Sequence, residues 1–356
     1  MNKIYLFFLL LISFENLKSQ NYSGPESVEF DYANNRYLIS NTTSKTIIAR
    51  DAAGNRTTFL SGFTSGPHGL EIVGNTLYAC DGSRVKGYNL TTKAQVMNIN
   101  LGATFLNGIT HDNNGNLYVT DFSAKKIYRI NHNAQTFNLY VTGLTKSPNG
   151  IIFDQPNNRL VFVNWGTNAP VNAINMADSS VSTLTTTTLG NCDGIATDGN
   201  GKFYVSAWST NSVHLFTGNF TTAPVNVWSG LSNPADIFYN VVSDTLACPN
   251  AGNNTVVFKY FGTTVMTKEI NKKTSIHVFP NPSNGILNIS NPEQIEIENI
   301  SLYDVTGKEI FNWQTASMQN FTFDISTMNL KNGVYFIKAL HRDKIIFQEK
   351  FLYSEE

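Results

Sequence analysis

The chain has 356 residues, a net charge of -1 and only 14% charged residues. Such a balance argues against nucleic acid as a partner, because nucleic-acid-binding proteins carry clustered lysine and arginine. The 25 glycines and 12% aromatic residues, without long helical periodicity, favour short strands joined by tight turns. We expect an all-β protein that is long enough to hold more than one domain.

Residues 1–19 are predicted to be a signal peptide. Lys3 provides a positive end, residues 4–14 form an apolar run, and cleavage near Ser19 would leave Gln20 as the first residue. The run is too short to span a bilayer as a stable helix, although an uncleaved anchor is the alternative. After cleavage we expect an exported protein without a transmembrane helix.

One phrase recurs along residues 20–270 and predicts a propeller. In residues 107–121 a polar residue and a glycine open a short strand, an Asp/Asn/Gly turn follows, and a second alternating strand ends on an acid, which is the pattern of a β-hairpin. The phrase returns about every 40 residues. Four strands per unit of this length predict a β-propeller of six blades, with a parallel solenoid as the alternative. In the third unit the expected strands are 108–110, 117–120, 126–130 and 136–141, and the first and last units are also expected to carry four strands.

The three cysteines are expected to be unpaired. Cys80 and Cys248 occupy equivalent positions of repeats that are not adjacent, and strands so far apart exceed the roughly 7 Å limit on Cα separation for a disulfide. We interpret both, together with Cys192, as small apolar residues of the core.

After a polar linker at residues 271–275 the repeat stops, and residues 276–356 show alternating strands with Gly/Asn turns. This pattern predicts a small antiparallel β-sandwich. Three blocks, Pro280-Asn281-Pro282, residues 304–308 and residues 332–335, resemble the C-terminal sorting domain of type IX secretion. The resemblance implies the type IX machinery as a partner, a secreted or cell-surface protein, and removal of this domain on export. An accessory sandwich that binds a ligand is the alternative.

The propeller repeats resemble six-bladed NHL-repeat propellers and the gluconolactonase/senescence-marker lactonase family. Pro148-Asn149-Gly150-Ile151 is similar to that second family's metal-binding asparagine motif, and Cys192-Asp193-Gly194-Ile195 is similar to its metal-binding aspartate motif. The resemblance implies Lewis-acid catalysis on a lactone, with Asp193 as a catalytic acid that helps to activate water. It also places Asn107 at a substrate-contacting position. Leu106, Gly108 and Phe30 depart from the residues that the family usually has nearby.

Two sets of residues are expected to converge around the propeller axis, at the start of the first strand and at the end of the second strand of each unit. The opening positions are Glu26, His68, Asn107, Asn149, Asp193 and Ala235, and the closing positions are Asn41, Asp81, Asp121, Asn164, Ala207 and Pro249. Glu26, Asn149 and Asp193 offer oxygen ligands that suit Ca²⁺ or another divalent cation. Asn-Gly and Asp-Gly also form turns at such junctions, so a purely structural role is the alternative.

Further candidates for ligand binding are His68, Asn107, Trp165 and Trp208. The imidazole could act as a base or a ligand, or be held by a hydrogen bond alone, and the indoles could stack on a ligand or pack between blades. Asp81 and Asp121 are expected to cap turns. The leading hypothesis is an exported propeller that binds a small molecule or a protein at its axial face. The alternatives are a divalent-metal-dependent lactonase or related hydrolase, and an adhesive or structural surface protein.

Overall fold

The structure is a computed structural model that describes residues 20–262, 276–292, 294–305, 307–315, 320–341 and 344–354. These residues form β-strands and three single-turn 3-10 helices, η1 (Gln155–Asn157), η2 (Trp208–Thr210) and η3 (Ser326–Met328). The predicted all-β class is therefore confirmed. The expected signal peptide and the expected linker at 271–275 lie outside the described residues. Within the described part of the chain, no helix is long and apolar enough to cross a membrane.

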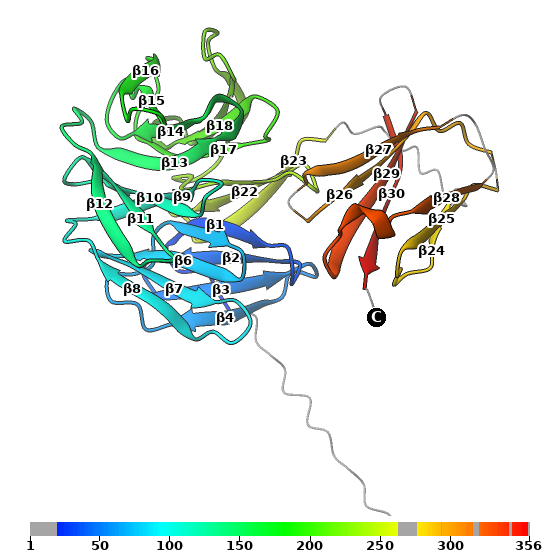
Figure 1. Ribbon diagram of the computed structural model, residues 1–356. Coiled ribbons are helices and arrows are strands. Elements are labelled where there is room, and N and C mark those ends of the chain that lie inside the picture. Colours follow the sequence, from blue (N-terminus) through cyan, green and yellow to red (C-terminus); the bar gives the residue numbers. More distant parts are fainter. Residues whose placement is uncertain are drawn as a thin grey trace, which may run out of the picture.

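The first 23 strands form six antiparallel sheets, which follow one another in chain order (Figure 1). The first three blades are β1 (Pro25–Asp31), β2 (Arg36–Asn41), β3 (Thr46–Asp51) and β4 (Arg56–Ser61); β5 (Leu70–Val73), β6 (Thr76–Asp81), β7 (Arg84–Asn89) and β8 (Gln95–Asn100); and β9 (Leu106–His111), β10 (Asn116–Asp121), β11 (Lys126–Asn131) and β12 (Thr136–Val141). The last three are β13 (Pro148–Asp154), β14 (Arg159–Asn164), β15 (Val171–Asn175) and β16 (Val181–Thr185); β17 (Cys192–Thr197), β18 (Lys202–Ala207), β19 (Ser212–Thr217) and β20 (Val225–Trp228); and β21 (Phe238–Asn240), β22 (Thr245–Asn250) and β23 (Thr255–Tyr260).

The six sheets are the blades of a closed ring. The first strands of successive blades contact one another, and β1 contacts both β5 and β21, so the first blade meets the last. A backbone hydrogen bond of 2.8 Å from Asp236 N to Glu26 O crosses this closure. Among the described residues the sixth sheet has three strands. The fourth strand expected in the last unit would follow β23, and residues 263–275 lie outside the described residues.

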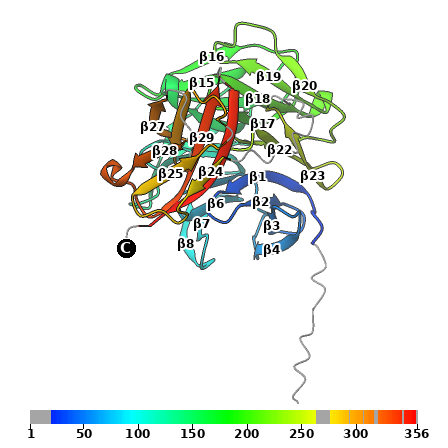
Figure 2. The same ribbon diagram turned by 90° about the vertical axis from the view of Figure 1, so that its right-hand side faces the viewer.

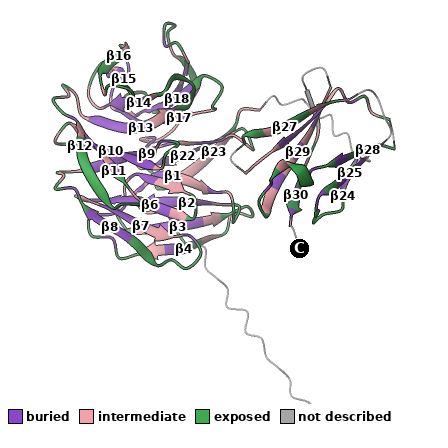
Figure 3. Cartoon of the chain, viewed as in Figure 1, coloured by how far each residue is buried: buried purple, intermediate pink, exposed green. Residues whose placement is uncertain are grey.

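Burial falls from the axis to the rim of each blade (Figure 3). All six residues of β10 are buried, whereas four of the six residues of the outermost strand β12 are exposed. Blades pack face to face close to the axis and diverge outwards, so the inner strands need apolar residues on both faces. Cys80, Cys192 and Cys248 are buried and free, as predicted.

A set of glycines lets the inner strands approach closely. A Cβ atom added to Gly150 would lie 2.6 Å from Asp193 O, and one added to Gly194 would lie 2.5 Å from Ile237 N, distances at which the backbone would have to move. Gly69 and Gly108 stand at the same position of their repeats and face Asn107 O and Asn149 O. The first and last blades instead carry Ser27 and Asp236 here, and Ser27 Oγ donates a hydrogen bond of 2.8 Å to Asp236 Oδ2.

The remaining strands form a β-sandwich, as predicted (Figure 2). One sheet contains β24 (His277–Phe279), β25 (Ile286–Ser290) and β28 (Asn320–Asp324), and the other contains β26 (Asn299–Tyr303), β27 (Glu309–Gln314), β29 (Gly333–His341) and β30 (Lys344–Tyr353). Side chains of both sheets share one apolar core, which includes Leu287, Ile300 and Ile337. Buried residues alternate with more exposed ones along β25 and β28, because one face of each strand is turned to this core.

Candidate functional site

The inner strands begin around a cavity of 240 Å³ at one end of the ring axis, which we call the first cavity. It is lined by all seven predicted site residues, Glu26, His68, Asn107, Asn149, Trp165, Asp193 and Trp208, together with Gly24, Pro25, Thr42, Phe105, Phe122 and Ala251. The repeat thus brings together side chains that are up to 182 positions apart in the chain, from Glu26 to Trp208. Their roles stay predictions, but their convergence is a property of the fold.

Three of these residues form an oxygen-rich cluster. Asn149 Nδ2 donates a hydrogen bond of 3.2 Å to Asp193 Oδ1, which turns the amide oxygen away from the aspartate. Asn149 Oδ1 and Glu26 Oε2 are both buried and have no hydrogen-bond partner. A buried acceptor without a donor is costly, so this cluster is suited to a ligand that accepts electron pairs from oxygen.

The two carboxyl groups of the cluster repel each other. Burial raises the pKa of Glu26 well above its usual value, and the nearby Asp193 and Asp236 raise it further. Burial and Asp236 likewise raise the pKa of Asp193, against smaller lowering effects of Trp208 and Asn149. No ion pair joins either carboxylate to a lysine or arginine among the described residues. A cation would relieve both the burial cost and the repulsion.

An arc of rings borders the first cavity. Each ring meets the next edge to face, with centroid distances of 4.7 Å from His68 to Phe105, 5.7 Å from Phe105 to Phe122, 5.9 Å from Phe122 to Trp165 and 5.1 Å from Trp165 to Trp208. We call this set the aromatic arc. Because the rings come from successive blades, they form an apolar wall beside the oxygen cluster, as is common in small-molecule sites.

Sequence reasoning missed Phe105 and Phe122, although one signal was present. Phe122 follows the last residue of β10, just as Trp165 follows β14 and Trp208 follows β18. An aromatic residue at the same position of three successive repeats therefore marked this side of the ring. Phe105 lies in a loop before β9 and had no such signal.

His68 lines the first cavity as a neutral imidazole. Burial lowers the pKa of His68 to about 4, so the ring carries no charge near neutral pH. Its Nδ1 atom is buried and has no hydrogen-bond partner. A neutral ring with a free nitrogen is suited to hydrogen-bond a ligand rather than to neutralise the acids.

The closing positions do not line the first cavity. Asp81 accepts hydrogen bonds from the backbone N–H groups of Thr64 and Ser65, and Asp121 accepts those of Thr104 and Phe105. Both bind the loop that precedes their own blade, which confirms the predicted capping role. In the last blade the equivalent residue is Asn250, which ends β22 and accepts from Ser232 N, rather than Pro249.

The first cavity fits a divalent cation by its donor set. Two carboxylates and an amide oxygen are the hard ligands that Ca²⁺ and Mg²⁺ prefer. Clusters of three or more His, Cys, Asp and Glu side chains in reach of one ion do not occur among the described residues, and the set here contains two acids and one amide. The residues that would hold a cation are Glu26, Asn149 and Asp193.

Comparison with protein families decides the role of the second domain. Residues 277–353 match the family described as the secretion system C-terminal sorting domain. The chain carries a type IX sorting domain. This sorting domain confirms the predicted partner machinery and indicates export to the cell surface or the medium. A comparison with curated proteins gave no match.

Solved structures share the propeller fold at low identity. A gluconolactonase from Xanthomonas campestris has a TM-score of 0.56 and 13% identity, covering 65% of this chain and 84% of its own. The calcium-binding protein regucalcin from Agrobacterium tumefaciens has a TM-score of 0.53 and 14% identity, and the match covers 65% of this chain and 83% of regucalcin. A chain of a nidogen/laminin complex has a TM-score of 0.51 and 21% identity, and the match covers 57% of this chain and 78% of that chain. These similarities establish the fold, which is used for catalysis and for protein binding alike.

Proposed function

We propose that the propeller is the exported cargo and binds a small molecule in the first cavity, over a divalent cation held by Glu26, Asn149 and Asp193. The observation that carries the proposal is the pair of buried acceptors without a partner, Glu26 Oε2 and Asn149 Oδ1, beside the carboxylate of Asp193. A scaffold alone has no use for two repelling acids at this position. The similarity to gluconolactonase and regucalcin supports a cation, since the second is named as a calcium-binding protein.

The aromatic arc supports a small molecule as the ligand of this site. The cavity holds 240 Å³, somewhat below the roughly 300 Å³ at which pockets for drug-sized ligands begin. Rings of Phe122, Trp165 and Trp208 offer flat apolar surface to a sugar or another compact ring. Asn107 and neutral His68 add polar contacts around it.

Thermal unfolding with and without cations tests the proposal. For the chain from Gln20 to Glu356, saturating Ca²⁺ should raise the melting temperature, because a ligand of the folded state adds about 2.7 kcal/mol at 100 times its Kd. Glu26→Gln and Asp193→Asn should lose the shift. Asp178→Asn, a change of the same kind in an exposed turn, should keep it. If none of Ca²⁺, Mg²⁺, Mn²⁺ and Zn²⁺ shifts the melting temperature, the proposed cation site is contradicted.

Hydrolysis of a lactone is the second candidate. It is favoured by Asp193, a buried acid of raised pKa in the lining of the first cavity. A bound divalent cation would supply Lewis-acid polarisation of a carbonyl. Asp193 would hold or accept a proton beside it, while the aromatic arc keeps bulk water out. Turnover of a panel of sugar lactones should be lost in Asp193→Asn and kept in Asp178→Asn. Binding of a lactone without turnover would contradict hydrolysis and leave only the binding role.

A further inference from the structure

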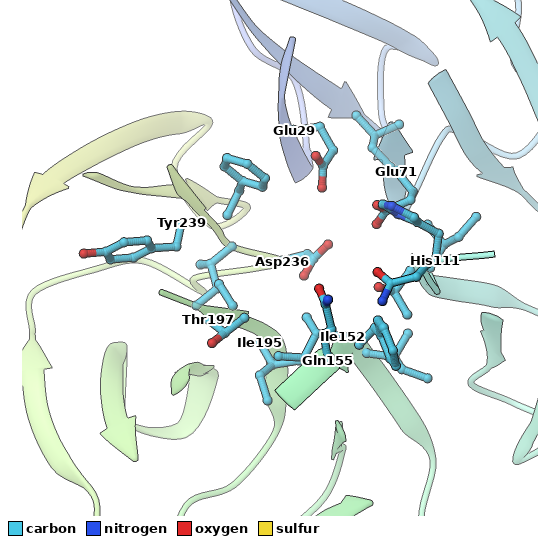
Figure 4. A pocket seen from close by; sticks show the side chains of 18 residues that line it. Glu29, Glu71, His111, Ile152, Gln155, Ile195, Thr197, Asp236 and Tyr239 are labelled. Carbon is cyan, nitrogen blue, oxygen red and sulfur yellow. The ribbon is translucent and has the colours of Figure 1, made fainter. Parts of the chain in front are cut away.

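A second cavity, of 290 Å³, lies at the other end of the same inner strands. Strands β1, β9, β13 and β17 contribute their first residues to the first cavity and later residues to the second, and no residue lines both. Figure 4 shows this second cavity with side chains from all parts of the ring directed toward one space. It is therefore a separate site on the opposite face of the propeller.

Acidic groups dominate the polar part of the second cavity. Glu71 lies 2.5 Å from His111 Nδ1, so this carboxylate has a partner. Glu29 and Asp236 have no lysine or arginine in an ion pair among the described residues, although Asp236 accepts a hydrogen bond from Ser27 Oγ. Both carboxylates face the cavity (Figure 4). Burial raises the pKa of Asp236 to about 7, so a bound cation would favour the ionised form of this carboxyl group.

The rest of the lining is apolar. Ile109, Ile151, Ile195 and Ile237 are buried and come from four successive blades, at equivalent positions of their repeats. Burial next to these residues, together with the charges of Glu71 and Asp236, raises the pKa of Glu29 well above its usual value. A ligand that suits this lining carries positive charge on one side and hydrocarbon on the other.

The spacing of the acids favours an organic cation over a metal ion. A Ca²⁺ or Mg²⁺ ion needs its oxygen ligands within about 2.0–2.6 Å. Among the described residues, no three His, Cys, Asp or Glu side chains converge closely enough to hold a metal ion, although four of them line this cavity. A cation that bridges separated carboxylates with N–H donors does fit such an arrangement.

We propose that the second cavity binds a small organic cation, an ammonium or guanidinium group on a short aliphatic stem. Glu29 and Asp236 accept the hydrogen bonds of its charged head. The stem lies against the isoleucines, and the Glu71–His111 pair borders the opposite side. A volume of 290 Å³ holds a molecule of this size. This site shares no lining residue with the first cavity.

Calorimetric titration of the full chain from Gln20 with agmatine and 1,5-diaminopentane tests the site, with 1-pentanol as an uncharged probe of the same stem. We expect saturable binding of at least one amine with one site per chain, and none of 1-pentanol. Glu29→Gln, which keeps size and removes charge, should weaken binding at least 10-fold. Asp178→Asn, in an exposed turn, should leave it unchanged.

A second variant keeps the test decisive if Glu29→Gln is poorly folded. Gln155 is exposed and its side chain lines the second cavity (Figure 4). Gln155→Lys would place a tethered ammonium group there and should abolish amine binding without loss of thermal stability. The proposal is overturned if neither amine binds at millimolar concentration, if 1-pentanol binds as well as the amines, or if a folded Glu29→Gln or Gln155→Lys binds them like the wild type.

Discussion

At the residue scale, the opening positions of the six repeats carry five different kinds of side chain on the same backbone. Glu26, Asn149 and Asp193 could be picked from the sequence because a repeat of fixed length must bring equivalent positions to one end of the axis. Asp236 could not. Asp236 occupies the position that is glycine in four repeats. The repeated glycine predicts only a close contact of backbones at this position. The carboxylate of Asp236 instead raises the pKa of Glu26 in the first cavity and of Glu29 in the second.

His68 gives a pH-dependent prediction at this scale. Burial lowers the pKa of His68 to about 4, against 6.5 in the unfolded chain. The unfolded state therefore binds a proton first, so this residue's contribution to stability is present above pH 6.5 and is lost as the pH falls toward 4. Between pH 7 and 4, wild type should lose about 2–3 kcal/mol of unfolding free energy relative to His68→Gln.

Denaturant unfolding of both proteins at each pH measures this difference. The comparison cancels the opposite effect of Glu26 and Asp193, whose raised pKa values make the fold more stable as the pH falls. A difference that does not change with pH would show that His68 is solvated in the folded protein.

At the scale of elements, the blade could be predicted from the sequence and its meeting with the next blade could not. The four expected strands of the third unit agree with β9–β12 to within two residues at each end, because alternation and Gly/Asn turns are local signals. Contacts between blades depend on side chains far apart in the chain. The edge-to-face contact between Phe122 and Trp165 shows this, since it joins two blades within the aromatic arc.

The glycines between inner strands give a prediction for this scale. Gly150→Ala would place a Cβ 2.6 Å from Asp193 O and should destabilise the propeller by about 1–3 kcal/mol, because backbone must move. It should also weaken Ca²⁺ binding, since Asn149 and Asp193 lie at that contact. Gly333→Ala is the matched control, because its Cβ would meet no atom closer than 3.8 Å. Equal stability of the two variants would contradict the close approach.

At the scale of the whole molecule, the chain combines a propeller, for which we propose a binding role, with a sorting domain for export. Short motifs in turns predicted the sorting domain correctly, since they reflect the local backbone of a small sandwich. The last blade was the weakest part of the sequence prediction. Its third strand, β23, is followed by residues 263–275, which lie outside the described chain, and the closure between Ser27 and Asp236 depends on a contact across 209 positions.

Removal of the sorting domain tests this division of roles. In a bacterium with type IX secretion, a chain that ends at residue 275 should accumulate in the periplasm, while the full chain reaches the surface or the medium. Fractionation and immunoblotting measure the distribution. A fusion of residues 276–356 to a periplasmic reporter should move that reporter outwards, and failure of the fusion to leave the periplasm would contradict an autonomous signal.

The most direct test of the central claim is calorimetric titration of the full chain from Gln20 with Ca²⁺ at pH 6 and pH 8. Because Glu26 and Asp193 have raised pKa values, a bound cation should displace protons, so binding should be tighter at pH 8. We predict one site per chain in wild type and none in Glu26→Gln or Asp193→Asn. No binding of Ca²⁺ or any other divalent ion, or equal binding by these variants, would contradict a cation site in the first cavity.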